Sequence, residues 1–210
     1  MNKLILSADQ IYALAYILKA KYLDYYYISL ASHGINHNLW LTSITKELVS
    51  KGVLTEDFSG ETELVSDYDA LVKPLYFGKK ESSLDINVLG ENESNVGYRF
   101  HFLDGNTIMT KLVDGMFEIS EVSAEDIRKI VMSILPADYS ALSAKTEISL
   151  DTNKITRVFV VKNAEIAVKS YVTTFVEMEG SVYEEDTENI LYTISGSDFI
   201  NKINKAIVEV

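Results

Sequence analysis

The stretch from Leu84 to Glu121 places the strongest constraint on the fold, because it predicts four consecutive antiparallel strands. Asp104-Gly105 and Asp114-Gly115 separate the later strands, and Asp-Gly pairs tolerate the positive φ angles of a tight hairpin turn. A polar loop, Gly90–Asn95, joins the first two strands. These signals predict a meander with the strands Leu84–Leu89, Val96–Leu103, Thr107–Val113 and Met116–Glu121.

The second predicted strand has the period-2 alternation of a strand with one buried face. One face carries Val96, Tyr98, Phe100 and Phe102, and the other carries Gly97, Arg99, His101 and Leu103. The aromatic face either offers rigid anchors to a partner or forms core beneath the first helix. We expect Tyr98 to contact a partner, because it lies nearest the polar loop. We expect His101 at a surface or an interface rather than in the role of a base.

Serine residues mark the start of predicted helices on both sides of the meander. Ser7-Ala8-Asp9-Gln10 follows a short predicted strand, Lys3–Leu6, and has capping-box spacing, with an amide three residues after the hydroxyl. Ser123-Ala124-Glu125-Asp126 and Ser195-Gly196-Ser197-Asp198 also place a serine directly before an apolar helical pattern. We therefore predict helices after Ser7, Ser123 and Ser195.

Two further helices are predicted between the first helix and the meander. One covers Leu39–Lys51 and ends at Gly52, a typical left-handed terminator. The other covers about Glu61–Lys73 and stops before Pro74, because proline disfavours helical geometry in the preceding residue. Helix, glycine, short apolar pair, loop and helix is also the order found in a winged-helix DNA-binding protein.

The C-terminal part of the chain adds strands to the prediction. Lys145–Leu150 is predicted as a strand, and Val172–Glu179 is predicted to pair with Asn189–Ile194 as a hairpin. Residues 153–171 fit either strand or helix. The predicted fold class is therefore α+β, with a central, mostly antiparallel sheet flanked by helices.

Composition indicates a globular protein without membrane spans or disulfides. The chain has 210 residues, 47% of them hydrophobic, which is enough to bury a sizeable core. With two prolines and no Gly/Ser-rich linker, we predict one domain over 1–210, with related halves at 1–136 and 137–210. The absence of cysteine excludes thiol catalysis and fits a reducing compartment. The apolar run at the N-terminus is too short for a signal peptide, and we expect a cytoplasmic protein.

The net charge of −12 argues against a nucleic-acid partner, because phosphates repel an acidic surface. The Glu61–Lys73 helix, which would enter the DNA groove in a winged-helix protein, carries four acidic residues and one lysine. Residues Glu177 to Glu188 contain six acidic residues and no basic one. This acidic run is either a solvated edge or a docking surface for a basic partner.

Signatures of catalysis are missing from the sequence. It has no Gly-rich phosphate loop and no Gly-x-Ser-x-Gly motif. His33 and His37 have the spacing of metal ligands on one helix face, but Gly34 and Asn36 favour a loop there. We therefore predict a protein that is not an enzyme, with no metal site and no cofactor.

The order and spacing of these elements resemble the EspG family of type VII secretion chaperones, and especially its relatives in the Bacilli. The resemblance rests on a helical unit that ends in Leu71-Val72-Lys73-Pro74, then the meander, then a helix from Val122-Ser123 to Leu135-Pro136. It implies a quasi-twofold protein and a cytosolic chaperone without enzymatic activity. Such a chaperone binds a helical secretion substrate, here expected to be encoded nearby, and keeps it soluble until export.

The resemblance also implies where the substrate binds. Members of the family contact their substrates partly through the loop between the second and third strands and partly through C-terminal helices. If Lys3–Leu6 is the first strand, that loop corresponds to Gly90–Asn95, which is shorter than in the family; the half after residue 136 is also abbreviated. The predicted partner-binding residues are Gly90, Glu91, Asn92, Glu93, Ser94, Asn95, Val96 and Tyr98.

Two other functions are compatible with the sequence. The acidity and the run Glu177–Glu188 fit an immunity protein that neutralises a secreted toxin. The order of elements over Leu39–Lys73 fits a winged-helix regulator.

Overall fold

The computed structural model describes residues 3–32, 34, 36–91, 93–135, 139, 144–148, 150–165, 169–185 and 190–208. Its helices are α1 (Ala8–Ile17), α2 (Tyr25–Leu30), α3 (His37–Ser50), α4 (Asp69–Phe77), α5 (Ala124–Ser133) and α6 (Gly196–Val208). Its strands are β1 (Lys3–Leu6), β2 (Leu54–Glu56), β3 (Thr62–Leu64), β4 (Lys80–Val88), β5 (Ser94–Leu103), β6 (Asn106–Val113), β7 (Met116–Glu121), β8 (Ala144–Ile148), β9 (Ile155–Glu165), β10 (Lys169–Met178), β11 (Ser181–Glu185) and β12 (Leu191–Thr193). Short 3-10 turns occupy Ser66–Tyr68 and Thr152–Lys154.

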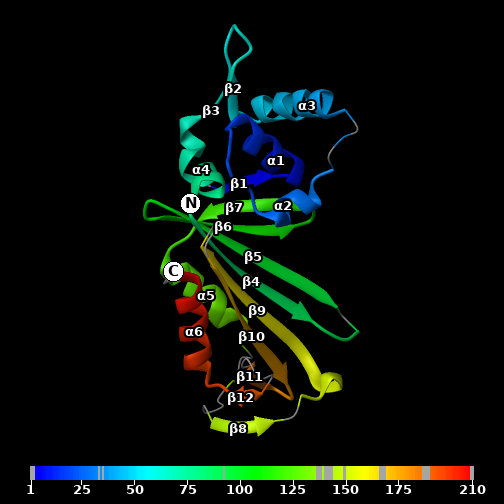
Figure 1. Ribbon diagram of the computed structural model, residues 1–210, viewed down its shortest axis with the longest axis vertical. Coiled ribbons are helices and arrows are strands. Elements are labelled where there is room, and N and C mark those ends of the chain that lie inside the picture. The colour runs from blue at the N-terminus through cyan, green and yellow to red at the C-terminus, as the bar shows by residue number, and fades with distance from the viewer. Residues whose placement is uncertain are drawn as a thin grey trace. The chain divides into compact units, whose positions relative to one another are not determined.

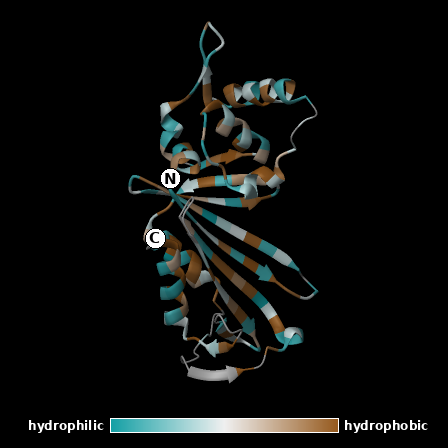
Figure 2. Cartoon of the chain, viewed as in Figure 1, coloured by the Kyte–Doolittle hydropathy of each residue, from teal (hydrophilic) through white to brown (hydrophobic). Residues whose placement is uncertain are grey.

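Most of the strands belong to one antiparallel sheet, with the order β1-β7-β6-β5-β4-β9-β10-β11-β12-β8 (Figure 1). Strands β2 and β3 form a separate hairpin. Helices flank the sheet, which confirms the predicted α+β class. Figure 2 shows hydrophobic and hydrophilic residues alternating along β4 and β5, the pattern from which strands were predicted.

The chain forms two compact units and crosses between them three times. The first unit contains Met1–Lys79 and His101–Glu121, and the second contains Lys80–Phe100 and Val122–Val210. Strand β5 therefore contributes residues to both. The related halves predicted at 1–136 and 137–210 stay a prediction.

The predicted meander is confirmed as β4, β5, β6 and β7, which are neighbours in the sheet in that order. Its two Asp-Gly turns have positive φ angles at both central residues: 50° and 82° at Asp104 and Gly105, and 51° and 77° at Asp114 and Gly115. Positive φ at both positions is what a type I′ hairpin turn requires. The local sequence therefore determines the register here.

The core of the first unit lies between β1, β6 and β7 and the helices α1 to α4. Leu6, Leu14 and Phe117 are fully buried in it. The predicted capping box is present at the start of α1, where Ser7 Oγ accepts from Gln10 N at 3.1 Å and Gln10 Oε1 accepts from Ser7 N at 3.2 Å. The helix predicted over Leu39–Lys51 is confirmed as α3, with Gly52 at a φ of 72° behind it.

The helix predicted over Glu61–Lys73 is wrong, because Thr62–Leu64 is strand β3 and the helix there, α4, runs from Asp69 through Pro74 to Phe77. Pro74 has no N–H, so it cannot donate the usual helical hydrogen bond to the carbonyl of Ala70. The side chain of Asn106 replaces that donor, with Nδ2 at 2.7 Å from the Ala70 oxygen. Tertiary structure thus keeps the proline inside the helix, and the groove-reading helix of a winged-helix protein does not form.

In the second unit, α6 packs against β4, β9 and β10. The Phe199 ring meets Phe159 at 5.3 Å and Phe175 at 5.0 Å, both edge to face. Asn163 Nδ2 also donates to the carbonyl of Ala206 at 2.7 Å. The segment 153–171, which fits strand or helix by sequence, consists mainly of β9 and the start of β10 in its described part.

The hairpin predicted between Val172–Glu179 and Asn189–Ile194 is wrong, because β11 lies between the two strands. Glu179 and Gly180 form a tight turn with φ angles of 52° and 77°, so the chain reverses directly after β10. Strand β11 pairs with β10, and β12 pairs with β11. The helices predicted after Ser123 and Ser195 are confirmed as α5 and α6.

Candidate functional site

The loop between β4 and β5, predicted to bind a partner, is exposed in its described part. Gly90, Glu91, Glu93, Ser94 and Asn95 are open to solvent, whereas the predicted Asn92 lies outside the described residues. Gly90 has a φ of 102°, where glycine is favoured. At the base of the loop, Asn95 Nδ2 donates to Asn87 Oδ1 at 2.7 Å. A partner therefore has direct access to the loop, and its acidic side chains have room to reorient.

The other predicted site residues, Val96 and Tyr98, are half-buried on β5. By the alternation of a strand they lie on the opposite face from Asn95 and Arg99. The Arg99 guanidinium donates to Asp85 Oδ1 at 2.8 Å, in an ion pair whose side chains are only 13% and 19% exposed. Phe100, two residues beyond Tyr98, is fully buried. The predicted residues thus do not form one face, because Asn95 lies on the opposite face of β5 from Val96 and Tyr98.

Leu89 is an exposed apolar residue that the sequence prediction left out of the site. It directly precedes Gly90 and is 42% exposed. Its backbone is fixed, because Leu89 N donates to the Thr156 carbonyl at 2.9 Å. The position of Leu89 directly before the polar loop was a sequence signal for this exposure. It was missed because period-2 alternation alone does not distinguish an exposed strand end from a buried one.

The expectation that His101 lies at a surface or an interface is wrong, because its side chain is only 3% exposed. The Tyr27 hydroxyl lies 2.8 Å from His101 Nε2 and 2.6 Å from Thr110 Oγ1, in a polar network inside the first unit. Tyr27 comes from α2, 74 residues earlier in the chain. The network satisfies buried polar groups and is closed to a substrate.

The acidic run near the C-terminus is partly neutralised by partners within the second unit. Glu177 pairs with Arg157, whose Nε lies 2.6 Å from Glu177 Oε2. Glu179 pairs with Lys154 at 2.7 Å, and Glu184 pairs with Lys202. The pairing raises the pKa of the Lys154 ammonium, chiefly through its hydrogen bond to Glu179. Asp186 and Glu188 lie outside the described residues.

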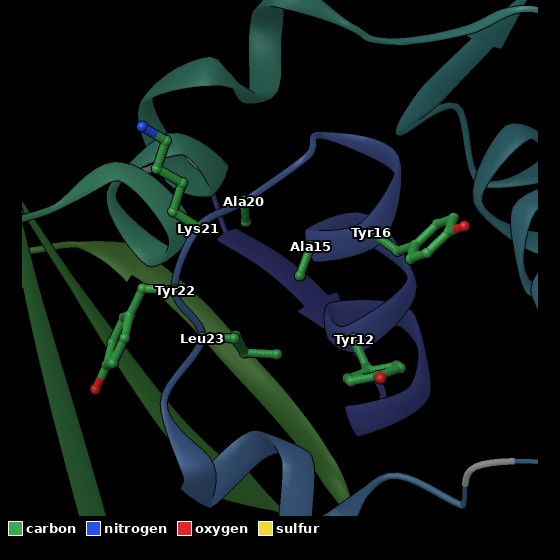
Figure 3. Close-up of a pocket in the computed structure, with 7 residues that line it drawn as sticks. All are labelled: Tyr12, Ala15, Tyr16, Ala20, Lys21, Tyr22 and Leu23. Carbon is green, nitrogen blue, oxygen red and sulfur yellow. The ribbon is translucent and has the colours of Figure 1, made fainter.

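A shallow pocket lies beside the C-terminal end of α1 (Figure 3). Its volume of about 200 Å³ is below the roughly 300 Å³ at which small-molecule sites usually begin. Tyr12 and Tyr16 extend from α1, whereas Lys21 and Tyr22 extend away from it, so the polar groups do not converge (Figure 3). This geometry does not favour a small-molecule site.

A larger groove, of about 440 Å³, lies between α5 and α6. Arg128 lines it from α5, and Asn201, Asn204 and Lys205 line it from α6. Among the described residues, no group of three or more His, Cys, Asp or Glu side chains is placed to hold a metal ion. His33 lies outside the described residues, and His37 stacks on Trp40 with ring centroids 5.6 Å apart.

No helix in the described part of the chain has the length and apolar character needed to cross a membrane.

Comparison with known proteins finds a similar fold but no similar sequence. No protein-family model matches the chain, and no curated protein matches it. Among solved structures, the chain is similar to the type VII secretion system chaperone EspG5 of Mycobacterium tuberculosis, solved in complex with a PE25-PPE41 dimer. The TM-score is 0.62 at 9% sequence identity, and the match covers 98% of this chain and 97% of the other. In fold, therefore, the chain is similar to a type VII secretion chaperone over nearly its whole length.

Proposed function

We propose that this chain is a non-enzymatic chaperone that binds a helical protein destined for type VII secretion and keeps it soluble in the cytoplasm until export. One observation carries the proposal: the fold matches that of EspG5 over 98% of this chain. A match of that extent includes both units, so it is not confined to one common supersecondary motif. The quasi-twofold division at 1–136 and 137–210 is part of the same proposal.

The proposed contact surface is the β4–β5 loop with the strand ends that flank it. Exposed Glu91, Glu93 and Asn95 supply a polar rim, and half-buried Val96 and Tyr98 supply apolar area. Leu89 adds an exposed apolar side chain on a fixed backbone. A polar rim around a few apolar anchors is the usual composition of a protein-binding surface. Gly90, Asn92 and Ser94 complete the proposed set.

The test begins with purification of the tagged chain from its native host. Any helical secreted protein that stays bound to it is then identified, and we expect its gene to lie near the gene of this chain. The identified protein is then expressed alone and together with the chain. We expect it to be insoluble alone and soluble as a complex. If deletion of the chain leaves both the solubility and the export of type VII substrates unchanged, the proposal is wrong.

Reversal of two loop charges, Glu91→Lys with Glu93→Lys, maps the surface. We expect the affinity for the identified substrate to fall at least about tenfold, since misplaced charge at an interface costs more than 1.4 kcal/mol. The matched control is Asp67→Lys with Glu121→Lys, which reverses two exposed carboxylates of the first unit. Equal affinities for the two variants in calorimetric titrations would show that the loop is not part of the binding surface.

A further inference from the structure

The hairpin of β2 and β3 is firmly attached to the core of the first unit at its base. The strands pair in antiparallel register from Leu54 with Leu64 to Glu56 with Thr62. Leu54 is buried in the core, and Val65 N donates to the Val53 carbonyl at 3.0 Å. In the view of Figure 1 the tip extends beyond α3 and α4. The hairpin is therefore a fixed projection of this unit.

The tip of the hairpin is held in one conformation by a single carboxylate. Asp57 Oδ1 accepts hydrogen bonds from Ser59 N at 2.8 Å, Ser59 Oγ at 2.7 Å and Glu61 N at 2.9 Å. The backbone closes as well, with Asp57 N donating to the Glu61 carbonyl at 3.0 Å and Gly60 N to the Asp57 carbonyl at 3.1 Å. Gly60 has a φ of 85°, which this tight turn requires. The turn is thus ordered before any partner arrives.

Phe58 stands at the apex of this turn with its side chain in solvent. Its relative exposure of 113% is higher than that of any other large apolar residue in the described part of the chain. An aromatic ring on a fixed backbone loses little conformational entropy on binding, so it is a favourable anchor for an interface. Nothing in the turn's hydrogen bonding depends on the ring.

The surroundings of Phe58 are acidic. From Leu54 to Leu64 the sequence has four carboxylates and no basic residue. Asp57 accepts the hydrogen bonds of the turn, and Glu56, Glu61 and Glu63 are exposed on the same hairpin. Such a rim repels an anionic lipid surface, and it also repels an identical hairpin from a second copy of the chain. It attracts a surface of opposite charge.

From this geometry we infer that the β2–β3 hairpin is a docking element, whose Phe58 ring enters an apolar pocket rimmed by Lys or Arg on a protein partner. The ring supplies the buried contact, and the glutamates select the partner and accelerate its approach. The hairpin belongs to the first unit and the β4–β5 loop to the second, so this inference does not depend on the proposed chaperone surface. It stands even if the chain has another function.

The partner is identified by photo-crosslinking in the native host. The full chain carries benzoylphenylalanine in place of Phe58, and the matched control carries it in place of Thr55, which is also exposed on the hairpin. We expect position 58 to crosslink one protein at an apolar pocket bordered by Lys or Arg, and Thr55 to crosslink it far less. Crosslinks to lipid, to a second copy of the chain or to a pocket without basic residues overturn the inference, as does the absence of crosslinks.

Affinity measurements with that purified partner complete the test. We expect Phe58→Ala to weaken binding at least about thirtyfold and Phe58→Leu less, as befits a central aromatic anchor. Changing Glu56, Glu61 and Glu63 to Gln is expected to slow association about tenfold and to flatten its salt dependence. Because the ring is fully exposed, the fold should not depend on it, and unchanged amide shifts of Leu54 and Val65 at the base of the hairpin verify folding. A folded Phe58→Ala variant that binds as tightly as the wild type overturns the inference.

Discussion

Asn106 shows how one distant side chain stabilises a helix, α4, that contains an internal proline. Its amide donates to the Ala70 carbonyl, which Pro74 leaves without the helical donor. We predict that Asn106→Ala lowers the free energy of unfolding by about 1 kcal/mol, the net value of one such hydrogen bond. Urea denaturation followed by circular dichroism measures the change.

The double-mutant cycle with Pro74→Ala distinguishes this role from general packing. Alanine at position 74 restores a backbone N–H that can reach the Ala70 carbonyl. The cost of Asn106→Ala should then fall to a few tenths of a kcal/mol. If Asn106→Ala lowers the free energy of unfolding equally with proline and with alanine at position 74, then Asn106 does not replace the missing helical donor.

Asp57 makes the hairpin tip sensitive to acid. Hydrogen bonds from the Ser59 side chain and then the Glu61 backbone lower the pKa of its carboxyl below the ordinary value. A lowered pKa in the folded state means that the stabilisation is complete above the unfolded-state pKa, about 3.9. It is lost as the pH falls through the folded-state pKa. We therefore predict that the turn persists at neutral pH and opens only in acid.

An NMR titration of the Asp57 carboxyl carbon and the Ser59 amide checks this prediction. Both signals should titrate together, at a pH below the ordinary aspartate value. Ser59→Ala removes the largest cause, so it should move the Asp57 pKa upward. If the pKa is the same in both proteins, the serine hydroxyl is not its cause.

At the scale of elements, the Tyr27 hydroxyl joins α2 to two strands of the sheet. It contacts His101 on β5 and Thr110 on β6, and all three side chains are buried. We predict that Tyr27→Phe lowers the free energy of unfolding by about 1 to 3 kcal/mol, because buried polar groups lose this partner. Denaturation at neutral pH measures the effect.

Removal of the hydroxyl partner on β6, Thr110 Oγ1, provides the control. Thr110→Val keeps the volume of the side chain, and in the Tyr27→Phe background it should cost less than in the wild type. Strict additivity of the two substitutions would show that the hydroxyl and Thr110 Oγ1 do not act as one network.

Elements whose signals are local were predictable from the sequence. Asp-Gly turns and serine caps depend on residues within four positions, so the meander and the helices α1, α5 and α6 were all predicted. The helix expected over Glu61–Lys73 failed because Thr62–Leu64 pairs with β2 as a strand. The helix there, α4, also continues past Lys73, because Asn106, more than thirty positions later, supplies the donor that Pro74 lacks. The β10–β11 turn at Glu179-Gly180 was missed, since its first residue is not a common turn former.

For the candidate site, the structure tests only exposure and burial, and the binding role of the loop stays a prediction. Polar composition predicted the exposure of the loop from Gly90 to Asn95 in its described part. The burial of His101 was not predictable, because it depends on Tyr27 from a distant helix. Phe58 was not singled out either, since an aromatic residue at a turn has no periodic pattern that marks it as exposed.

At the scale of the whole molecule, the connectivity of the two units predicts cooperative unfolding. The chain crosses between the units three times, and β5 contributes to both. Neither unit is a continuous segment, so neither can unfold without releasing strand residues of the other. We therefore predict one calorimetric transition rather than two.

A matched pair of core substitutions tests this prediction. Ile119→Val in the first unit and Ile203→Val in the second each shorten a fully buried side chain, at a typical cost of about 0.5 to 1.5 kcal/mol. Each should lower the same transition by about 2 to 4 °C per kcal/mol. Two transitions, each shifted by only one variant, would show independent units.

The stacking of Trp40 on His37 in α3 has a practical consequence for optical measurement. Trp40 is the only tryptophan, so all indole emission comes from the first unit, and the chain has no cysteine. A thiol introduced at exposed Thr55 would be the sole attachment point for a dye on the hairpin. An environment-sensitive dye at that thiol, excited by energy transfer from the indole, would then report through its own emission, in real time and with one substitution, when a partner covers the hairpin.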